Sequence, residues 1–339
     1  MLKVGLIGYG YWGPNLARNL ADSDDGVRLI AVADARDERR QAAERRHPGV
    51  KTFASADAMI ASDDVDAVVV ATPLATHKPL AESAIKRGKH VLVEKPLASS
   101  RRDAEFLAEL ADARGVRLMV DHTFVYTGAV RKIRSLIDEG DLGRLLYLDS
   151  VRVNLGLFQQ DSNVIWDLAV HDLSVMDHLI DARPVAVSAD GSCVSGYEHE
   201  NIAYITVHYD DGFLAHFHVN WLAPVKIRHM LLGGSQRMLV YNDMEPSEKV
   251  LVYDKGVEVN LDVQDDLARR QILVSYRTGD MYAPKLDRTE ALASVVREFA
   301  SAVAERRDPA TGAASGVRVV SLLEAAAQSL RSEGRRIRL

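Results

Sequence analysis

The chain has 339 residues, of which 47% are hydrophobic and 27% charged, values ordinary for a soluble globular protein and sufficient for two domains. The net charge of −6 gives no electrostatic reason to expect nucleic acid or an anionic membrane as partner. One cysteine, Cys193, excludes an intrachain disulfide and a zinc site made of several thiolates. No signal-peptide pattern and no apolar run of about 20 residues is present, which predicts a soluble cytoplasmic protein.

The first third of the chain alternates short apolar runs with amphipathic segments. Strands are expected at residues 4–7, 29–32, 67–71, 90–93 and 117–120, and helices at 12–20, 37–46, 77–87 and 100–114. Strands that are apolar throughout and separated by helices predict a parallel sheet covered on both faces. Right-handed crossovers then make the sheet doubly wound.

The pattern changes after residue 123. A helix at 130–139, a strand at 145–153 and a helix at 165–180 precede strand-like runs from 184 to 260, an irregular polar stretch at 261–285 and helices at 288–306 and 317–331. The fold class is therefore α/β. A Rossmann domain with a doubly wound parallel sheet is expected at 1–123, and an α+β domain with a large, mostly antiparallel sheet at 124–339. The C-terminal helices are free to pack back on the first domain.

A glycine-rich string follows the first strand and opens the first helix. Gly8, Gly10 and Gly13 enclose Tyr9, Tyr11 and Trp12 in the pattern G-x-G-x-x-G. In this context the glycines permit a tight turn, close approach of a pyrophosphate, and close packing of helix on strand. The helix N-terminus supplies N–H groups for the phosphates. The alternative is an ordinary strand–helix turn.

An acidic residue, Asp34, stands at the end of the second strand. A carboxylate there can accept hydrogen bonds from the adenosine ribose hydroxyls and would repel a 2′-phosphate, which favours NAD over NADP. Arg36 stands nearby and could hold a phosphate, so NADP is the alternative.

The tripeptide Glu94-Lys95-Pro96 follows the strand at 90–93 and so lies at the carboxyl end of the sheet, where open α/β folds bind ligands. Lys95 can stabilise developing charge on a substrate oxygen, and Glu94 can position it. Pro96 restricts the backbone and is compatible with a cis peptide bond. A solvated Glu-Lys pair in a surface loop is the alternative.

Asp167 and His171 are four residues apart, on one face of an expected helix. Histidine titrates near neutral pH and can take a hydroxyl proton as hydride leaves, while Asp167 can orient it or bind a neighbouring hydroxyl. A plain surface Asp–His pair fits the spacing equally well. His216 and His218 share one face of a strand, but nothing in the sequence links them to Asp167 and His171, so no metal is expected.

Together these motifs resemble the Gfo/Idh/MocA family of sugar oxidoreductases over essentially the whole chain. The resemblance rests on the three glycines, Asp34, Thr72-Pro73 followed by His77, the stretch from 88 to 97 with Glu94-Lys95-Pro96, the glycines of 140–143, and the Asp167…His171 spacing. It implies catalytic roles for Lys95, Asp167 and His171. It also implies that Thr72, Pro73, His77, Glu94 and Lys95 join the fingerprint residues in binding the cofactor.

The stretches at 121–124, 154–156 and 166–172 further resemble members that act on nucleotide-linked sugars. This implies oxidation of a C3 hydroxyl or reduction of a 3-keto group in amino- or deoxysugar synthesis. Tyr126, Arg152 and Asn154 are further candidates for substrate contacts, with plain packing as the alternative. A homodimer or homotetramer formed through the second domain's sheet is implied as well.

Three rival functions remain open. A redox-assisted glycosidase would recycle tightly held NAD, and a free sugar or inositol dehydrogenase would use the same residues on another substrate. A non-catalytic nucleotide-binding sensor is the third, and the presence of Lys95, Asp167 and His171 argues against it.

Overall fold

A computed structural model describes residues 1–156, 162–259 and 274–339. The chain divides into two compact units. The first contains residues 1–128, 173–178 and 288–324, and the second contains 129–172, 179–287 and 325–339. The two units interleave along the chain, and the sequence-based domain limits of 1–123 and 124–339 stay a prediction.

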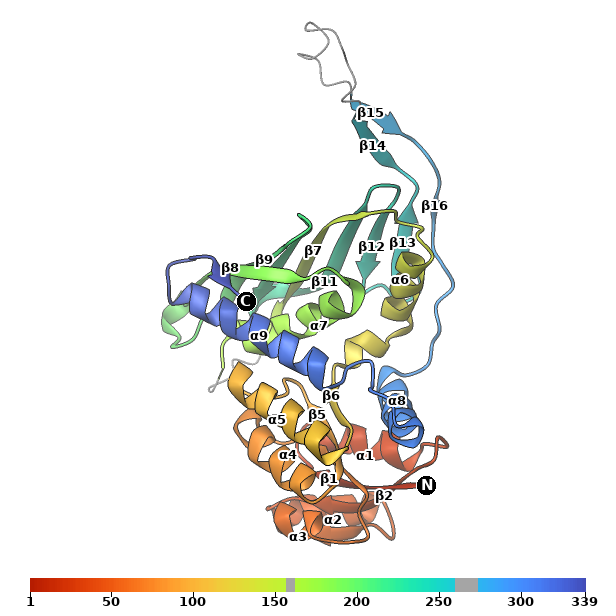
Figure 1. Ribbon diagram of the computed structural model, residues 1–339, viewed down its shortest axis with the longest axis vertical. Coiled ribbons are helices and arrows are strands. Elements are labelled where there is room, and N and C mark those ends of the chain that lie inside the picture. The colour runs from red at the N-terminus through yellow and green to blue at the C-terminus, as the bar shows by residue number, and fades with distance from the viewer. Residues whose placement is uncertain (157–161, 260–273) are drawn as a thin grey trace, which may run out of the picture. The chain divides into compact units, whose positions relative to one another are not determined.

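The first unit is built on a six-stranded sheet (Figure 1). Its strands are β1 (Leu2–Ile7), β2 (Val27–Ala33), β3 (Lys51–Phe53), β4 (Ala67–Val70), β5 (His90–Glu94) and β6 (Leu118–Asp121). They lie in the order β3-β2-β1-β4-β5-β6, and all five pairs are parallel. This is the doubly wound order that binds dinucleotides where the strand order reverses, between β1 and β4. The expected Rossmann fold is confirmed.

Helices connect these strands. They are α1 (Gly13–Ala21), α2 (Asp37–Arg46), α3 (Ala56–Ile60), α4 (His77–Lys86) and α5 (Arg101–Arg114), and α4 and α5 lie side by side (Figure 1). Local sequence sets the ends of α5. The Ser100 hydroxyl accepts a hydrogen bond from Asp103 N at 3.1 Å, and Gly115 closes the helix with a φ of 65° that favours glycine. β3 and α3 were not anticipated, because each is only a few residues long.

A helix from the end of the chain completes the core of the first unit. α8 (Ala291–Glu305) buries Val295, Val296 and Phe299 in one cluster with Leu16 and Leu20 of α1. The helix is amphipathic, so its apolar stripe covers a face that residues 1–128 would otherwise leave open to water.

The second unit is built on a nine-stranded sheet. Its order is β16-β13-β12-β11-β7-β10-β9-β8-β17, and every pair is antiparallel except β10 with β7. The strands are β7 (Leu145–Leu155), β8 (Pro184–Ser192), β9 (Ile202–Tyr209), β10 (Leu214–Asn220), β11 (Leu222–Gly234), β12 (Met238–Asn242), β13 (Val250–Tyr253), β16 (Met281–Tyr282) and β17 (Ile337–Arg338). The large, mostly antiparallel sheet is confirmed.

Some elements differ from the expectations. The helix expected at 165–180 begins with a π-helical turn, η3 (Ile165–Ala169), before α7 (Val170–Leu179). The stretch expected to be irregular at 261–285 contains β15 (Val274–Arg277), paired with β14 (Gly256–Val259), and β16. Residues 260–273 lie outside the described part. The remaining helices are α6 (Gly128–Asp138) and α9 (Ala313–Leu330).

Across the three described ranges, every helix is too short or too polar to cross a lipid bilayer.

The role of α8 in the first unit can be tested at Phe299, whose side chain is fully buried. We expect Phe299→Ala to lower the free energy of unfolding by about 3 to 5 kcal/mol, because it removes buried apolar area and leaves a cavity. Urea unfolding followed by circular dichroism measures the change. Arg297→Ala on the same helix breaks only an exposed ion pair with Asp25 and should cost less than about 1 kcal/mol. Equal losses in the two variants would contradict this packing.

Candidate active site

The glycine-rich turn after β1 has no room for side chains at two of its three glycines. Gly8 has a φ of +94°, and a Cβ added there would lie 2.4 Å from the Ala71 carbonyl oxygen. A Cβ added to Gly13 would lie 2.4 Å from the Gly8 carbonyl oxygen. A Cβ on Gly10 would meet only an Arg36 nitrogen, at 3.8 Å, so this glycine leaves an open approach to the backbone. The turn thus has the space that a dinucleotide pyrophosphate needs, and contacts of these glycines with a cofactor stay a prediction.

The two aromatic residues of the fingerprint point outward. Tyr11 is 86% exposed and Trp12 is 46% exposed, and their rings meet edge to face with centroids 5.6 Å apart. Their part in cofactor binding stays a prediction.

Asp34 is fixed by the glycine-rich turn. Its Oδ2 accepts a hydrogen bond from Tyr9 N at 2.8 Å, and its Oδ1 accepts one from Arg36 N at 2.9 Å. Burial by itself would raise the pKa of Asp34, but these hydrogen bonds outweigh it and hold the pKa below its usual range. The Arg36 guanidinium also donates to Oδ1, at 3.3 Å. The carboxylate is therefore ionised and oriented at the end of β2.

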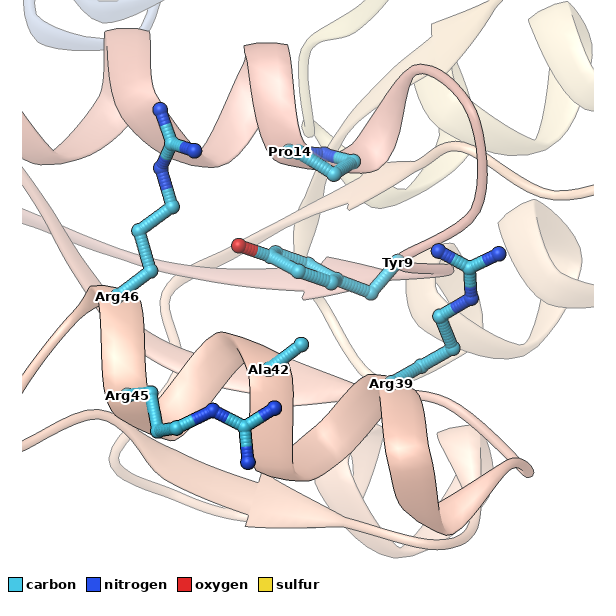
Figure 2. A pocket seen from close by; sticks show the side chains of 6 residues that line it. All are labelled: Tyr9, Pro14, Arg39, Ala42, Arg45 and Arg46. Carbon is cyan, nitrogen blue, oxygen red and sulfur yellow. The ribbon is translucent and has the colours of Figure 1, made fainter.

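A cationic cleft of about 410 Å³ lies between this turn and α2. Figure 2 shows the Tyr9 ring between Pro14 of α1 and Ala42 of α2, with the side chains of Arg39, Arg45 and Arg46 reaching out from α2 around it. Three guanidinium groups beside apolar walls favour anions. The cleft adjoins Tyr9, whose backbone N–H donates to Asp34. Its arginines therefore bear on the choice between NAD and NADP, because Asp34 is the residue predicted to favour NAD.

His77 joins two loops at the carboxyl edge of the sheet. The ring lies at the start of α4 and is 1% exposed, with Nδ1 2.8 Å from the Pro96 carbonyl oxygen and Nε2 2.8 Å from the Thr72 carbonyl oxygen. Burial lowers its pKa despite these two contacts. A neutral imidazole donates to one of the two carbonyls. Thr72 and Pro73 therefore lie in a loop that His77 ties to the Glu94-Lys95-Pro96 segment.

Glu94, Lys95 and Pro96 occupy the end of β5. The Lys95–Pro96 peptide bond is cis, as the sequence allowed. Lys95 N donates to Glu94 Oε2 at 3.1 Å, so the glutamate folds back over its own loop. Burial and the neighbouring Asp121 raise the pKa of Glu94 to about 8, against the lowering effect of Lys95.

Asp121 is the last residue of β6 and His122 follows it, and neither was among the expected site residues. Each is 1% exposed. Burial raises the pKa of Asp121 to about 6, although a hydrogen bond from Thr123 and the charge of Lys95 lower it. Burial lowers the pKa of His122 to about 3, so its ring is neutral at physiological pH. Their position at the end of a strand next to β5 was the available sequence signal.

Tyr126 belongs to the packed interior of the first unit. It is 6% exposed, and its hydroxyl lies 2.8 Å from Thr311 Oγ1 and accepts a hydrogen bond from Thr311 N at 3.3 Å. This arrangement fits the packing alternative for Tyr126.

In the second unit, Asp167 lies in the π-helical turn η3 and is held by a tryptophan. Trp221 is fully buried, and its indole N–H donates to Asp167 Oδ2 at 3.0 Å. A Cβ on Gly156 would lie 2.6 Å from the Trp221 ring, so that glycine is needed for the indole to fit. π-helical turns occur frequently at functional sites. Trp221 was not anticipated, because only the fold brings it to Asp167.

The other candidates in the second unit differ in their surroundings. Arg152 of β7 forms a buried, two-pronged ion pair with Asp172, with N···O distances of 2.9 and 2.7 Å. This pair anchors the first turn of α7, where His171 is partly buried. Asn154 is half-buried on β7. Substrate contacts by Arg152 and Asn154 stay predictions.

The two histidines of β10 stack on an aromatic ring. The centroid of the Tyr204 ring lies 6.3 Å from the centroid of the His216 ring and 4.6 Å from that of the His218 ring. Within the described ranges, no three His, Cys, Asp or Glu side chains gather as a set of metal ligands.

A doubly wound sheet with this glycine turn and an acidic residue ending β2 defines a dinucleotide-binding protein. Residues 2–122 match the family model described as "Oxidoreductase family, NAD-binding Rossmann fold", and residues 130–241 match the GFO/IDH/MocA C-terminal domain. The chain belongs to the Gfo/Idh/MocA family of oxidoreductases, and its N-terminal part is an NAD-binding Rossmann domain.

Individual relatives have different names. The chain is 28% identical to a UDP-N-acetylglucosamine 3-dehydrogenase from Acidithiobacillus ferrooxidans over 94% of both chains. It is 30% identical to inositol 2-dehydrogenase 2 from Saccharopolyspora erythraea over 63% of this chain and 65% of that protein. Its identity to 2,7-anhydro-N-acetylneuraminate hydratase from Escherichia coli is 29%, over 63% of this chain and 60% of that one. The first two curated relatives are thus matched over 57% and 65% of their length. The solved structure of the A. ferrooxidans dehydrogenase matches with a TM-score of 0.82 at 24% identity, over 98% of both chains.

The glycine turn yields a test that separates binding from folding. We expect Gly10→Ala to keep the free energy of unfolding within about 1 kcal/mol, because its Cβ has space, but to weaken NAD binding by blocking the pyrophosphate. Gly13→Ala should destabilise the fold as well, because its Cβ would overlap the Gly8 carbonyl. Thermal unfolding with and without NAD measures both effects. Unchanged NAD affinity in Gly10→Ala would argue against this cradle.

Proposed function

We propose that this protein is an NAD(P)-dependent sugar oxidoreductase that transfers hydride between the nicotinamide and a secondary alcohol or ketone, at C3 of a nucleotide-linked amino- or deoxyhexose. The observation that carries the proposal is the Glu94-Lys95-Pro96 segment at the carboxyl edge of the sheet that also bears the glycine turn. Ligands of doubly wound sheets bind at this edge.

In this proposal the bound dinucleotide supplies the hydride acceptor or donor. Lys95 hydrogen-bonds the reacting sugar oxygen and stabilises its charge. His171 takes the hydroxyl proton during oxidation and returns it during reduction. Asp167 binds a neighbouring hydroxyl or orients His171, and Trp221 holds it in place. Glu94 positions Lys95 through the hydrogen bond from the Lys95 N–H.

For the cofactor we propose NAD, with NADP as the alternative. The ionised Asp34 favours the two free ribose hydroxyls of NAD. The arginines of the cleft in Figure 2 favour a phosphate, and they are the specific observation on the side of NADP.

For the substrate, the match to the UDP-N-acetylglucosamine 3-dehydrogenase over 94% of both chains supports a nucleotide-linked sugar. The partial match to an inositol dehydrogenase supports the second candidate, a free sugar or inositol. A redox-assisted glycosidase would differ from both because it turns over without added cofactor.

The substrate can be identified by calorimetric titration of cofactor-stripped protein, first with NAD(H) and NADP(H), then with UDP- and dTDP-sugars and myo-inositol. We expect a nucleotide sugar to bind only the cofactor complex and to be oxidised or reduced in an absorbance assay. Binding of inositol alone would move the assignment to the second candidate. Failure of both cofactors to bind would overturn the proposal.

Two variants test the residue roles. Lys95→Ala should lower kcat by about 10² to 10³-fold, because a donor to the charged oxygen is lost. His171→Asn should lower it by about 10² to 10⁴-fold through loss of the acid/base group. NAD should still bind both variants, although Lys95→Ala removes one of the predicted cofactor contacts. Lys86→Ala removes only an ion pair with Glu82 on α4 and is the control. Full activity of Lys95→Ala would exclude the proposed role.

We further propose that the protein self-associates through the nine-stranded sheet. Large side chains on one face of four adjacent strands are 37 to 45% exposed: Tyr147, Tyr204, Leu214 and Ile227. Burying such positions in a second copy would be favourable. Light scattering should therefore give a dimer or tetramer mass, and Tyr204→Glu with Leu214→Glu should give a monomer. A monomeric wild-type protein would contradict this.

A further inference from the structure

Two acidic residues end neighbouring strands at the carboxyl edge of the first unit's sheet. In the parallel pair β5–β6 the register sets Glu94 opposite Asp121, at the last residue of each strand. Residues opposite each other in a parallel pair point to the same face of the sheet. The fold therefore brings together two carboxyl groups that stand 27 positions apart in the sequence.

The hydrogen bonds around this acidic pair leave it incompletely satisfied. Asp121 Oδ1 accepts from Thr123 Oγ1 at 2.8 Å, and Glu94 Oε2 accepts from Lys95 N at 3.1 Å. Asp121 Oδ2 is buried and has no hydrogen-bond partner in the described part of the chain. A buried carboxylate oxygen without a donor is costly, and a proton held by the pair reduces that cost.

The charged and titratable groups around the pair come from several elements of the first unit. Lys95 is the cation that acts on both carboxyls. His77 at the start of α4 and His122 after β6 both feel the Lys95 charge, and burial keeps both neutral. Tyr126 of the short turn Thr123–Tyr126 stays protonated, because burial raises its pKa. One positive charge thus stands beside two carboxyls.

The number of protons on the pair determines the net charge of the two carboxyls and Lys95 together. With one proton shared, the pair carries one negative charge, and together with Lys95 the group is neutral. With no proton, the group carries one net negative charge in a buried place. Two neighbouring carboxyls, of which Asp121 is buried and Glu94 is half-buried, resist ionising together and titrate as a unit.

The position of the pair relates it to the nicotinamide. A doubly wound sheet binds the two halves of a dinucleotide on its two halves, and the glycine turn and Asp34 mark the β1–β2–β3 half for the adenosine. The β4–β5–β6 half, which ends in Glu94 and Asp121, is left for the nicotinamide. The oxidised ring is positively charged, whereas the reduced ring is neutral.

We propose that Glu94 and Asp121 share one proton in the free protein and release it to solvent when the oxidised dinucleotide binds, but not when the reduced one binds. The inference rests on the dinucleotide binding of the proposed function. The charges balance in both cases. With the oxidised ring, two carboxylates face Lys95 and the ring cation. With the reduced ring, one carboxylate faces Lys95 alone.

The affinity for NAD⁺ should depend on pH. Release of a proton on binding makes binding tighter as pH rises, by up to about tenfold per pH unit for one proton. The effect should fall between about pH 6 and about pH 8, the range set by the two carboxyl pKa values. The affinity for NADH should stay flat over the same range.

The test is calorimetric titration of the full chain with NAD⁺, NADH and ADP-ribose at neutral pH, in buffers of different ionisation enthalpy. The dependence of the observed enthalpy on the buffer gives the number of protons exchanged. We expect about one proton released per NAD⁺ and none for NADH or ADP-ribose. Equal release for all three ligands would overturn the proposal.

Variants show which groups hold the proton. Asp121→Asn leaves Glu94 as a single carboxylate opposite Lys95, so the release should disappear while NAD⁺ still binds. Glu94→Gln should also abolish the release, with weaker NAD⁺ binding because Glu94 is a predicted cofactor contact, and it serves if Asp121→Asn does not fold. Asp112→Asn, an exposed acid on α5, is the matched control and should keep the release. Persistent release in both Asp121→Asn and Glu94→Gln would place the proton elsewhere and refute the assignment.

No sugar enters this experiment, so it separates the inference from the proposed function. Failure of NAD⁺ and NADH to bind would overturn both. Binding of both without a difference in proton release would overturn only the inference.

Discussion

The contact between the start of α1 and the end of β1 is the constraint on which the first unit depends. Gly13 packs so closely on the Gly8 carbonyl that it has no space for a side chain, and Gly8 has none because the Ala71 carbonyl lies against it. The contact sets the N-terminus of α1 at the carboxyl edge of the sheet, and the same turn places Tyr9 N against Asp34. One short string of glycines thereby fixes both the predicted phosphate cradle and the carboxylate that is predicted to face the ribose.

The pKa values of the acidic residues differ along that edge of the sheet. Asp34 is held ionised by backbone donors, whereas at the other half of the sheet burial raises the pKa values of Glu94 and Asp121, and Asp121 raises that of Glu94 further. His77 and His122 are kept neutral by burial. Burial and hydrogen-bond donors thus shift the pKa values of two aspartates, Asp34 and Asp121, in opposite directions, and Lys95 is the cation that acts on both Glu94 and Asp121.

Much of the fold follows from local pattern. Apolar runs of four to six residues separated by amphipathic helices specify a parallel sheet, and the elements named in advance at 4–7, 37–46 and 90–93 lie within β1, α2 and β5. The short β3 and α3 carry too few residues for a periodic signal. The π-helical turn at Ile165–Ala169 was also not predicted, because it shares the apolar spacing of an α-helix. It is set by packing against β10.

By itself the sequence determined the dinucleotide turn, Asp34, the Glu94-Lys95-Pro96 segment and the family, because each depends on residues that are close along the chain. Only the tertiary structure decided which distant groups share an environment. It set Asp121 beside Glu94 through strand register, bonded Trp221 to Asp167, and closed Arg152 on Asp172. Protonation and orientation depend on burial and on neighbours from other elements, and no local pattern in the chain carries that information.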